Sequence, residues 1–288
     1  MALLYLLLVL AAADLVGGAG SAALTVAAYA VAAVLVLTVE GWLRLRGSPP
    51  ARLPEALSVE QSQRFVAGAA LGAYALTVAF WLLASRPSGG FVGPFSLSPR
   101  GQTVHMLSVE LLRLPLIVFA VVLSVMRWGR GDRGPLRLDR QVMALALTLL
   151  ALDVGLTELI GLVSGMRLGA SFGYFQGYWP VVFLLVVATG GFPQAVIYQG
   201  IVLRDLITWL GGRPVLACFA AMLAFNAAQA ASLAAGHVTA SGVRDLMLGI
   251  VLPGQPAGLL LGYLFLRTRS LIPGMALIGL MHLGAGII

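Results

Sequence analysis

The chain alternates long apolar runs with short segments that carry nearly all of its charged residues. Crossing the hydrocarbon core of a bilayer takes an α-helix of about 20 apolar residues, and most of the runs reach that length. Helices are the expected conformation because they satisfy their backbone hydrogen bonds internally, without water. Nine runs therefore predict membrane helices, over residues 2–20, 22–43, 64–85, 104–126, 141–165, 178–207, 214–236, 245–266 and 271–288.

The composition predicts the same class of protein. Of the 288 residues, 60% are hydrophobic and 10% are charged, and the mean hydropathy is +0.97. So few charges cannot cover the surface of a soluble globule, and we expect an all-α, polytopic transmembrane bundle whose solvent is the lipid bilayer. The single cysteine, Cys218, excludes a disulfide framework and a cysteine metal cluster.

The arginines, which are the only basic residues besides histidine, predict the orientation. Loops on the cytoplasmic side are enriched in positive charge. If Met1 is cytoplasmic, the external segments hold only four of the 18 arginines. We therefore expect an integral protein of a prokaryotic inner membrane with a cytoplasmic N-terminus, and no nucleic-acid partner despite the net charge of +7. The four external arginines are Arg86, Arg100, Arg167 and Arg244.

Two features predict how the chain is divided. Residues 128–140 are basic and contain three glycines and a proline, as expected for a cytoplasmic linker. We expect N-terminal membrane helices of unassigned role over residues 1–127 and a second membrane domain over 141–288. Within the run 245–266, Pro253 and Pro256 predict a broken or kinked helix, which membranes tolerate where the helix lines protein or a cavity.

Four ionisable residues lie inside predicted membrane helices, where an unpaired charge is costly. Glu110 and Arg113 are three residues apart and can pair along one helix face, while Asp153 and Glu158 lie on the next helix and could bridge to Arg113. We favour a structural ion-pair network. A path for protons or substrate, and carboxylates that are wet at the membrane interface, remain as alternatives.

Three segments of the last part of the chain occur in a recognisable order: Gln194–Leu206, Phe225–Gln229 and Gly258–Pro273, the last followed by a final helix. Over about residues 140–288 the chain resembles the CPBP or Abi family of CAAX prenyl endopeptidases and bacteriocin-processing intramembrane proteases. The Arg-Thr-x-Ser-Leu-x-Pro turn that starts at Arg267 is among the most specific parts of this resemblance.

The resemblance implies three catalytic motifs, and this chain departs from all of them. Aligned on Gly200, the family's Glu-Glu-x-x-x-Arg motif falls on Gln194, Ala195 and Gln199. Its Phe-x-x-x-His motif keeps Phe225 but has Gln229 at the histidine position. Its His-x-x-x-Asn motif falls on Ile278 and His282, or, in a second register, on His282 and Gly286.

In the family, a glutamate polarises water, histidines place that water or a metal, and donors stabilise the oxyanion. Glutamine cannot accept a proton near neutral pH, so no general base remains at these positions. We therefore expect a pseudoprotease that acts as a scaffold, chaperone or subunit of a larger membrane complex, with no catalytic residue, metal or cofactor. The alternatives are a protease with displaced catalytic groups, such as Asp153 or Glu158, and a transporter or lipid-handling protein.

The amides themselves suggest a further structural hypothesis. Gln194, Gln199, Asn226 and Gln229 could form a fully satisfied hydrogen-bond cluster that keeps the shape of the former pocket. The cluster would serve as polar glue between helices, or as a pocket that binds a peptide, a lipid or a prenyl-like chain without cutting it.

Overall fold

A computed structural model of the chain describes residues 19–45, 58–84, 111–128, 136, 140–163, 179–234 and 256–283. All regular structure in these residues is helical. The helices are α2 (Ala19–Leu45), α3 (Val59–Ala84), α5 (Leu114–Trp128), α6 (Arg140–Val163), α7 (Trp179–Val186), η4 (Val187–Gly191), α8 (Phe192–Gln194), η5 (Ala195–Leu203), α9 (Arg204–Trp209), α10 (Pro214–Ala234), α12 (Pro256–Thr268) and α13 (Ile272–Leu283).

The helices confirm the prediction of an all-α integral membrane protein. Within the described residues, four are long and apolar enough to cross a membrane: Val26–Leu45, Val59–Phe80, Arg140–Val163 and Trp179–Trp209. The other four apolar helices are shorter, and the predicted runs 2–20 and 245–266 lie partly or mostly outside the described residues. The count of nine crossings and the cytoplasmic N-terminus therefore stay predictions.

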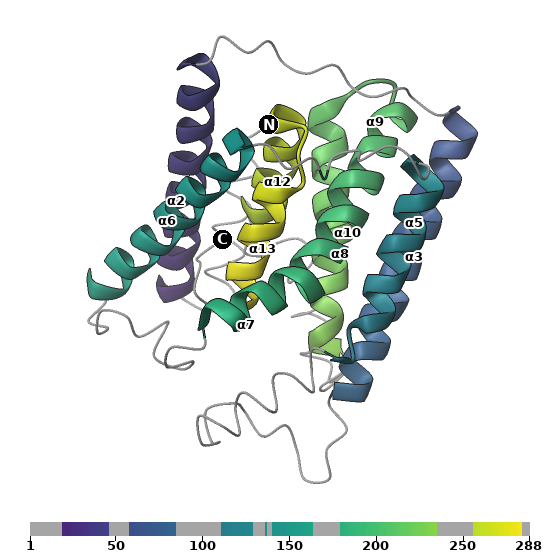
Figure 1. The fold of residues 1–288 in the computed structure, drawn as a ribbon, viewed down its shortest axis with the longest axis horizontal. Helices are drawn as coiled ribbons and strands as arrows, with labels where there is room; N and C mark the ends of the chain where they lie inside the picture. Colours follow the sequence, from purple (N-terminus) through teal and green to yellow (C-terminus); the bar gives the residue numbers. More distant parts are fainter. Residues whose placement is uncertain are drawn as a thin grey trace.

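Helices α2, α3, α5 and α6 flank the helices of the last third of the chain on two sides (Figure 1). Figure 1 shows α2 and α6 on one flank, α3 and α5 on the opposite flank, and α8, α10, α12 and α13 between them. Helix α2 packs on α6 and α12, while α3 and α5 pack on the segment from α8 to α10. One cluster of buried side chains includes Leu35 and Leu116 as well as Ile201 and Leu277, so a continuous core joins both parts of the chain.

The helix that carries the first motif is the most buried one. Residues 179–209 run as one helix in which two stretches, η4 and η5, have π-helical geometry. Every residue of η5 is buried. Pro193 lies between the two π-helical stretches and lacks a backbone N–H, so it interrupts the α-helical hydrogen bonds. This interruption accounts for the change from α-helical to π-helical geometry beside it. π-Helical turns are rare and often occur at functional sites.

Two ion pairs tie the flanking helices to the centre. At the end of α5, Arg127 Nη2 donates to Asp205 Oδ1 on α9 over 2.9 Å, and both side chains are buried. On the other flank, Arg267 of α12 donates to both carboxylate oxygens of Glu40 on α2, over 2.8 and 2.9 Å. The hydroxyl of Tyr263 also donates to Glu40. These contacts connect residues that are far apart in sequence.

We expect Asp205→Asn to destabilise the protein strongly, by roughly 3–5 kcal/mol, because it leaves the buried Arg127 guanidinium without its counter-charge. Thermal unfolding of the purified protein in mild detergent measures the loss. The matched control is Glu60→Gln, which removes the same charge from the exposed Arg64–Glu60 pair and should change stability little. Equal losses in the two variants would contradict the structural role of the Arg127–Asp205 pair.

Candidate functional site

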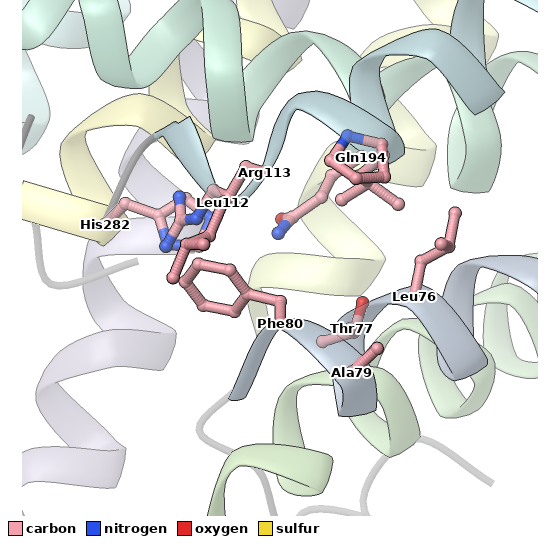
Figure 2. A pocket seen from close by; sticks show the side chains of 10 residues that line it. Leu76, Thr77, Ala79, Phe80, Leu112, Arg113, Gln194 and His282 are labelled. Carbon is pink, nitrogen blue, oxygen red and sulfur yellow. The ribbon is translucent and has the colours of Figure 1, made fainter. Parts of the chain in front are cut away.

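A small pocket lies where α3, the start of α5, α8 and α13 meet. Its volume is about 60 Å³, and Figure 2 shows Gln194 extending toward the side on which His282 and Arg113 lie together. The pocket brings Gln194, the first position of the first motif, beside the last helix. Its lining residues are Leu76, Thr77, Ala79, Phe80, Leu112, Arg113, Pro115, Leu116, Gln194 and His282.

Arg113 reaches this pocket from the turn that precedes α5. Its backbone carbonyl accepts hydrogen bonds from the N–H groups of Leu116 and Ile117, at 2.9 and 3.2 Å, which fixes the turn to the first residues of the helix. Its guanidinium carbon lies 4.9 Å from the centre of the Phe80 ring, in a cation–π contact. The N-terminal helices α3 and α5 therefore supply an aromatic ring and a positive charge to a pocket whose other polar residues come from the C-terminal region.

Gly190 makes room for the two nitrogen-bearing side chains. A Cβ atom at this position would lie 2.8 Å from Arg113 Nη1 and 2.9 Å from His282 Cδ2, closer than real contacts allow. Because Gly190 has no side chain, the side chains of Arg113 and His282 can both pack against the helix at this position. Nearby, a Cβ at Gly191 would overlap the Met275 carbonyl of α13, so the missing side chain also lets α13 approach closely.

The turn before α13 is held by hydroxyl groups. The Thr268 hydroxyl donates to the Leu264 carbonyl over 2.7 Å and accepts from the Ser270 N–H over 3.2 Å. The Ser270 hydroxyl accepts from the Ile272 N–H over 3.2 Å and so caps the start of α13. Arg269 between them has a φ of 56°, in the left-handed region. This turn sets the direction in which α13 leaves and thereby places His282.

Two other motif residues, Gln199 and Phe225, line a second, smaller cavity of about 10 Å³ together with Tyr198. The Tyr198 and Phe225 rings pack edge to face, with their centres 5.4 Å apart. Among the described residues, neither Gln199 Oε1 nor Asn226 Nδ2 has a hydrogen-bond partner. The amides of Gln199 and Asn226 therefore do not have all of the hydrogen bonds that the predicted cluster would give them. The side chain of Gln229, the fourth predicted member, lies outside the described residues.

The comparison with known proteins gives the family of this region. Residues 176–284 match the family model described as type II CAAX prenyl endopeptidase Rce1-like. We refer to this matched stretch as the Rce1-like region. The match confirms the resemblance inferred from the motifs, over a shorter stretch than residues 140–288. No curated protein and no solved structure matches the chain.

Within the Rce1-like region, the third motif has one residue in the pocket. His282 lines it, whereas Ile278 is buried in the hydrophobic core, and Gly286 lies outside the described residues. Ala195, at the second glutamate position, is fully buried and packs in the same core. The choice between the two registers of this motif stays a prediction.

Of the four ionisable residues proposed as an intramembrane network, the structure describes Arg113, Asp153 and Glu158, and their pairing stays a prediction. Glu110 lies outside the described residues. Asp153 is fully buried on α6, a helix that packs extensively on α13, and Glu158 is partly buried one turn further along. Arg113 lines the pocket together with Gln194 and His282 of the Rce1-like region. The residues around Arg113 in the sequence give no sign of this position.

The residues around the pocket do not fit a divalent metal ion. The described part of the chain contains no group of three or more histidine, cysteine, aspartate or glutamate residues arranged to hold one. The polar lining consists of a guanidinium, an imidazole, an amide and the Thr77 hydroxyl, which already donates to the Ala73 carbonyl over 2.7 Å. A guanidinium in the lining also repels a second cation.

We expect Gly191→Ala to destabilise the protein by about 1–3 kcal/mol, because the added Cβ must push away the Met275 backbone of α13. Thermal unfolding in mild detergent measures the effect. The control is Gly155→Ala on α6, where an added Cβ meets nothing within 4 Å and the better helix propensity should stabilise by up to about 1 kcal/mol. A neutral Gly191→Ala variant would contradict the tight packing of α13 described above.

Proposed function

We propose that this protein is a catalytically inactive Rce1-like membrane protein, a pseudoprotease that serves as a scaffold or subunit of a larger membrane complex. The observation that carries the proposal is the chemistry of the pocket at Gln194 and His282. Among the described residues, no carboxylate lines it, and its charged lining group is the Arg113 guanidinium. Hydrolysis by the mechanism that the resemblance implies would need a carboxylate base, which the lining does not contain.

The remaining groups are poor substitutes for a glutamate. The Gln194 amide cannot take a proton from water near neutral pH, and a guanidinium stays protonated. His282 could accept a proton only by becoming an imidazolium beside the Arg113 guanidinium, and like charges oppose that step. An efficient general base must form its protonated state readily, so this arrangement argues against activation of water.

The two alternatives have less support. A protease with displaced groups would need Asp153 or Glu158 near the attacked bond, and neither lines the pocket that holds Gln194 and His282. Asp205, which with Asp153 is a buried carboxylate of the described residues, is engaged by Arg127 through two guanidinium nitrogens. A transporter path that uses the carboxylates of α6 would have to run outside this pocket, because its lining does not include them.

The scaffold part of the proposal concerns the outer faces of the bundle. Helix α5 exposes Val118, Val121, Val122, Val125 and Met126 to its surroundings. Such a face is covered either by lipid or by the apolar helix of another membrane protein. A complex partner is therefore compatible with this surface, and an experiment has to distinguish the two.

The test uses the full chain purified in mild detergent. We expect no cleavage of a prenylated peptide with a CAAX-type end, nor of a model transmembrane peptide, above the background of a mock purification. We also expect a membrane protein to co-purify in a fixed ratio, identified by mass spectrometry. A solitary, monodisperse protein that cleaves either peptide, and loses this activity on His282→Gln, would refute the proposal.

A further inference from the structure

We propose that the pocket formed by Gln194, Arg113 and His282 binds the carboxylate of a membrane amphiphile, with the apolar part of that molecule running between α3 and α5. The inference rests on the proposed function, because it needs a pocket in which no catalytic glutamate would repel the anion. It goes further by assigning the pocket a ligand of stated chemistry.

The polar side chains of the lining are suited to an anion. A guanidinium, the Nε2 atom of an imidazole and the amide of a glutamine can each donate a hydrogen bond. The first two lie together at the bare face of Gly190, and Gln194 extends toward them from α8 (Figure 2). His282 Nε2 is buried and has no hydrogen-bond partner among the described residues. A ligand oxygen in the pocket would give it one.

The size of the pocket favours a carboxylate over a larger anion. Its free space of about 60 Å³ exceeds the ~15 Å³ needed by one water, so it holds a group of a few heavy atoms. A phosphodiester with its attached glycerol is bulkier than this. A carboxylate is planar and small, and a guanidinium nitrogen such as Arg113 Nη1, which lies beside His282 at Gly190, donates a charge-assisted hydrogen bond to it.

The apolar lining favours an amphiphile over a small soluble acid. Leu76, Phe80 and Leu116 line the pocket beside its polar residues. Leu112 and Ala79 also line it and are exposed, so the lining continues to the outer surface of the bundle. In a membrane protein that surface faces acyl chains, and burial of each methylene of a ligand adds about 0.8 kcal/mol of hydrophobic stabilisation. A long-chain carboxylate therefore matches both the polar residues of the pocket and its apolar lining.

Binding of oleate to the full chain in mild detergent tests the inference, with oleyl alcohol and acetate as comparison probes and native mass spectrometry or a fluorescent fatty-acid competition as the readout. We expect oleate to bind at least about tenfold more tightly than oleyl alcohol, because the alcohol lacks the charge that Arg113 recognises. Acetate should not compete at the same concentrations, because it lacks the apolar chain.

Two variants locate the binding site. Gln194→Glu keeps the size of the side chain but puts a negative charge in the pocket, and it should weaken oleate binding by about tenfold or more. Arg113→Gln should weaken it similarly. The matched controls, Gln141→Glu and Arg213→Gln, change the same groups at exposed positions outside the pocket and should leave binding unchanged. Thermal unfolding shows which variants are folded. If Arg113→Gln does not fold, the oleate affinity of the Gln194→Glu variant decides whether the ligand binds in this pocket.

Three outcomes would overturn the inference: equal affinity for oleate and oleyl alcohol, unchanged oleate affinity in a folded Gln194→Glu variant, or competition by acetate as effective as that by oleate. Equal affinity for oleate and oleyl alcohol would mean that only the apolar chain is bound. Unchanged affinity in Gln194→Glu would mean that oleate binds at another site, and effective competition by acetate would mean that the apolar chain does not contribute to binding. None of these measurements involves a peptide, so their failure is distinguishable from failure of the proposed lack of proteolysis.

Discussion

The close approach of α13 to the long helix that carries the first motif is the constraint on which the site depends. Helices can touch along their backbones only where side chains are absent, and here Gly191 faces the Met275 carbonyl while Gly274 faces the Gln199 side chain. The hydroxyl-capped turn before α13 fixes the direction from which the last helix arrives. Together these features bring His282 beside Gln194, although 88 positions separate them in sequence (282 − 194).

The same packing explains why helices N-terminal to the Rce1-like region contribute to its pocket. The family match covers residues 176–284, but two of the groups that define the pocket, Phe80 and Arg113, come from α3 and the start of α5. The buried Arg127–Asp205 pair holds the far end of α5 to α9, and the Arg267–Glu40 pair holds α2 to α12. The Rce1-like region is therefore completed by helices outside it, and the properties of its pocket are those of the whole bundle.

The chemistry of that pocket is internally consistent. The Gln194 amide, at a position where the resemblance implies a carboxylate, supplies neither a base nor a negative charge that would hold a cation. A guanidinium can then occupy the space beside His282, where it would compete with a metal ion in an enzyme. The pocket thus has the donors of an anion site in a place where the resemblance implies a proton acceptor, and the proposed lack of catalysis and the proposed carboxylate ligand have one physical origin.

Much of the architecture follows from the sequence alone, because bilayer burial makes few demands other than apolar length and internal hydrogen bonding. The runs of apolar residues predicted helices, and the order of motifs around Gln194, Phe225 and Arg267 predicted the family. The absence of a glutamate at position 194 is likewise a property of the sequence, and no fold can change it.

The tertiary structure decided which residues meet. Apolar periodicity in a membrane helix does not indicate a partner, because lipid and protein are both apolar and every face has a similar composition. For that reason the pairing of Arg127 with Asp205, the π-helical geometry around Pro193 and the placement of Arg113 beside His282 were not predicted from the sequence. Charges distant in sequence become partners only when the packing of helices sets their depth and direction, and here that packing places a guanidinium beside the imidazole of the pocket.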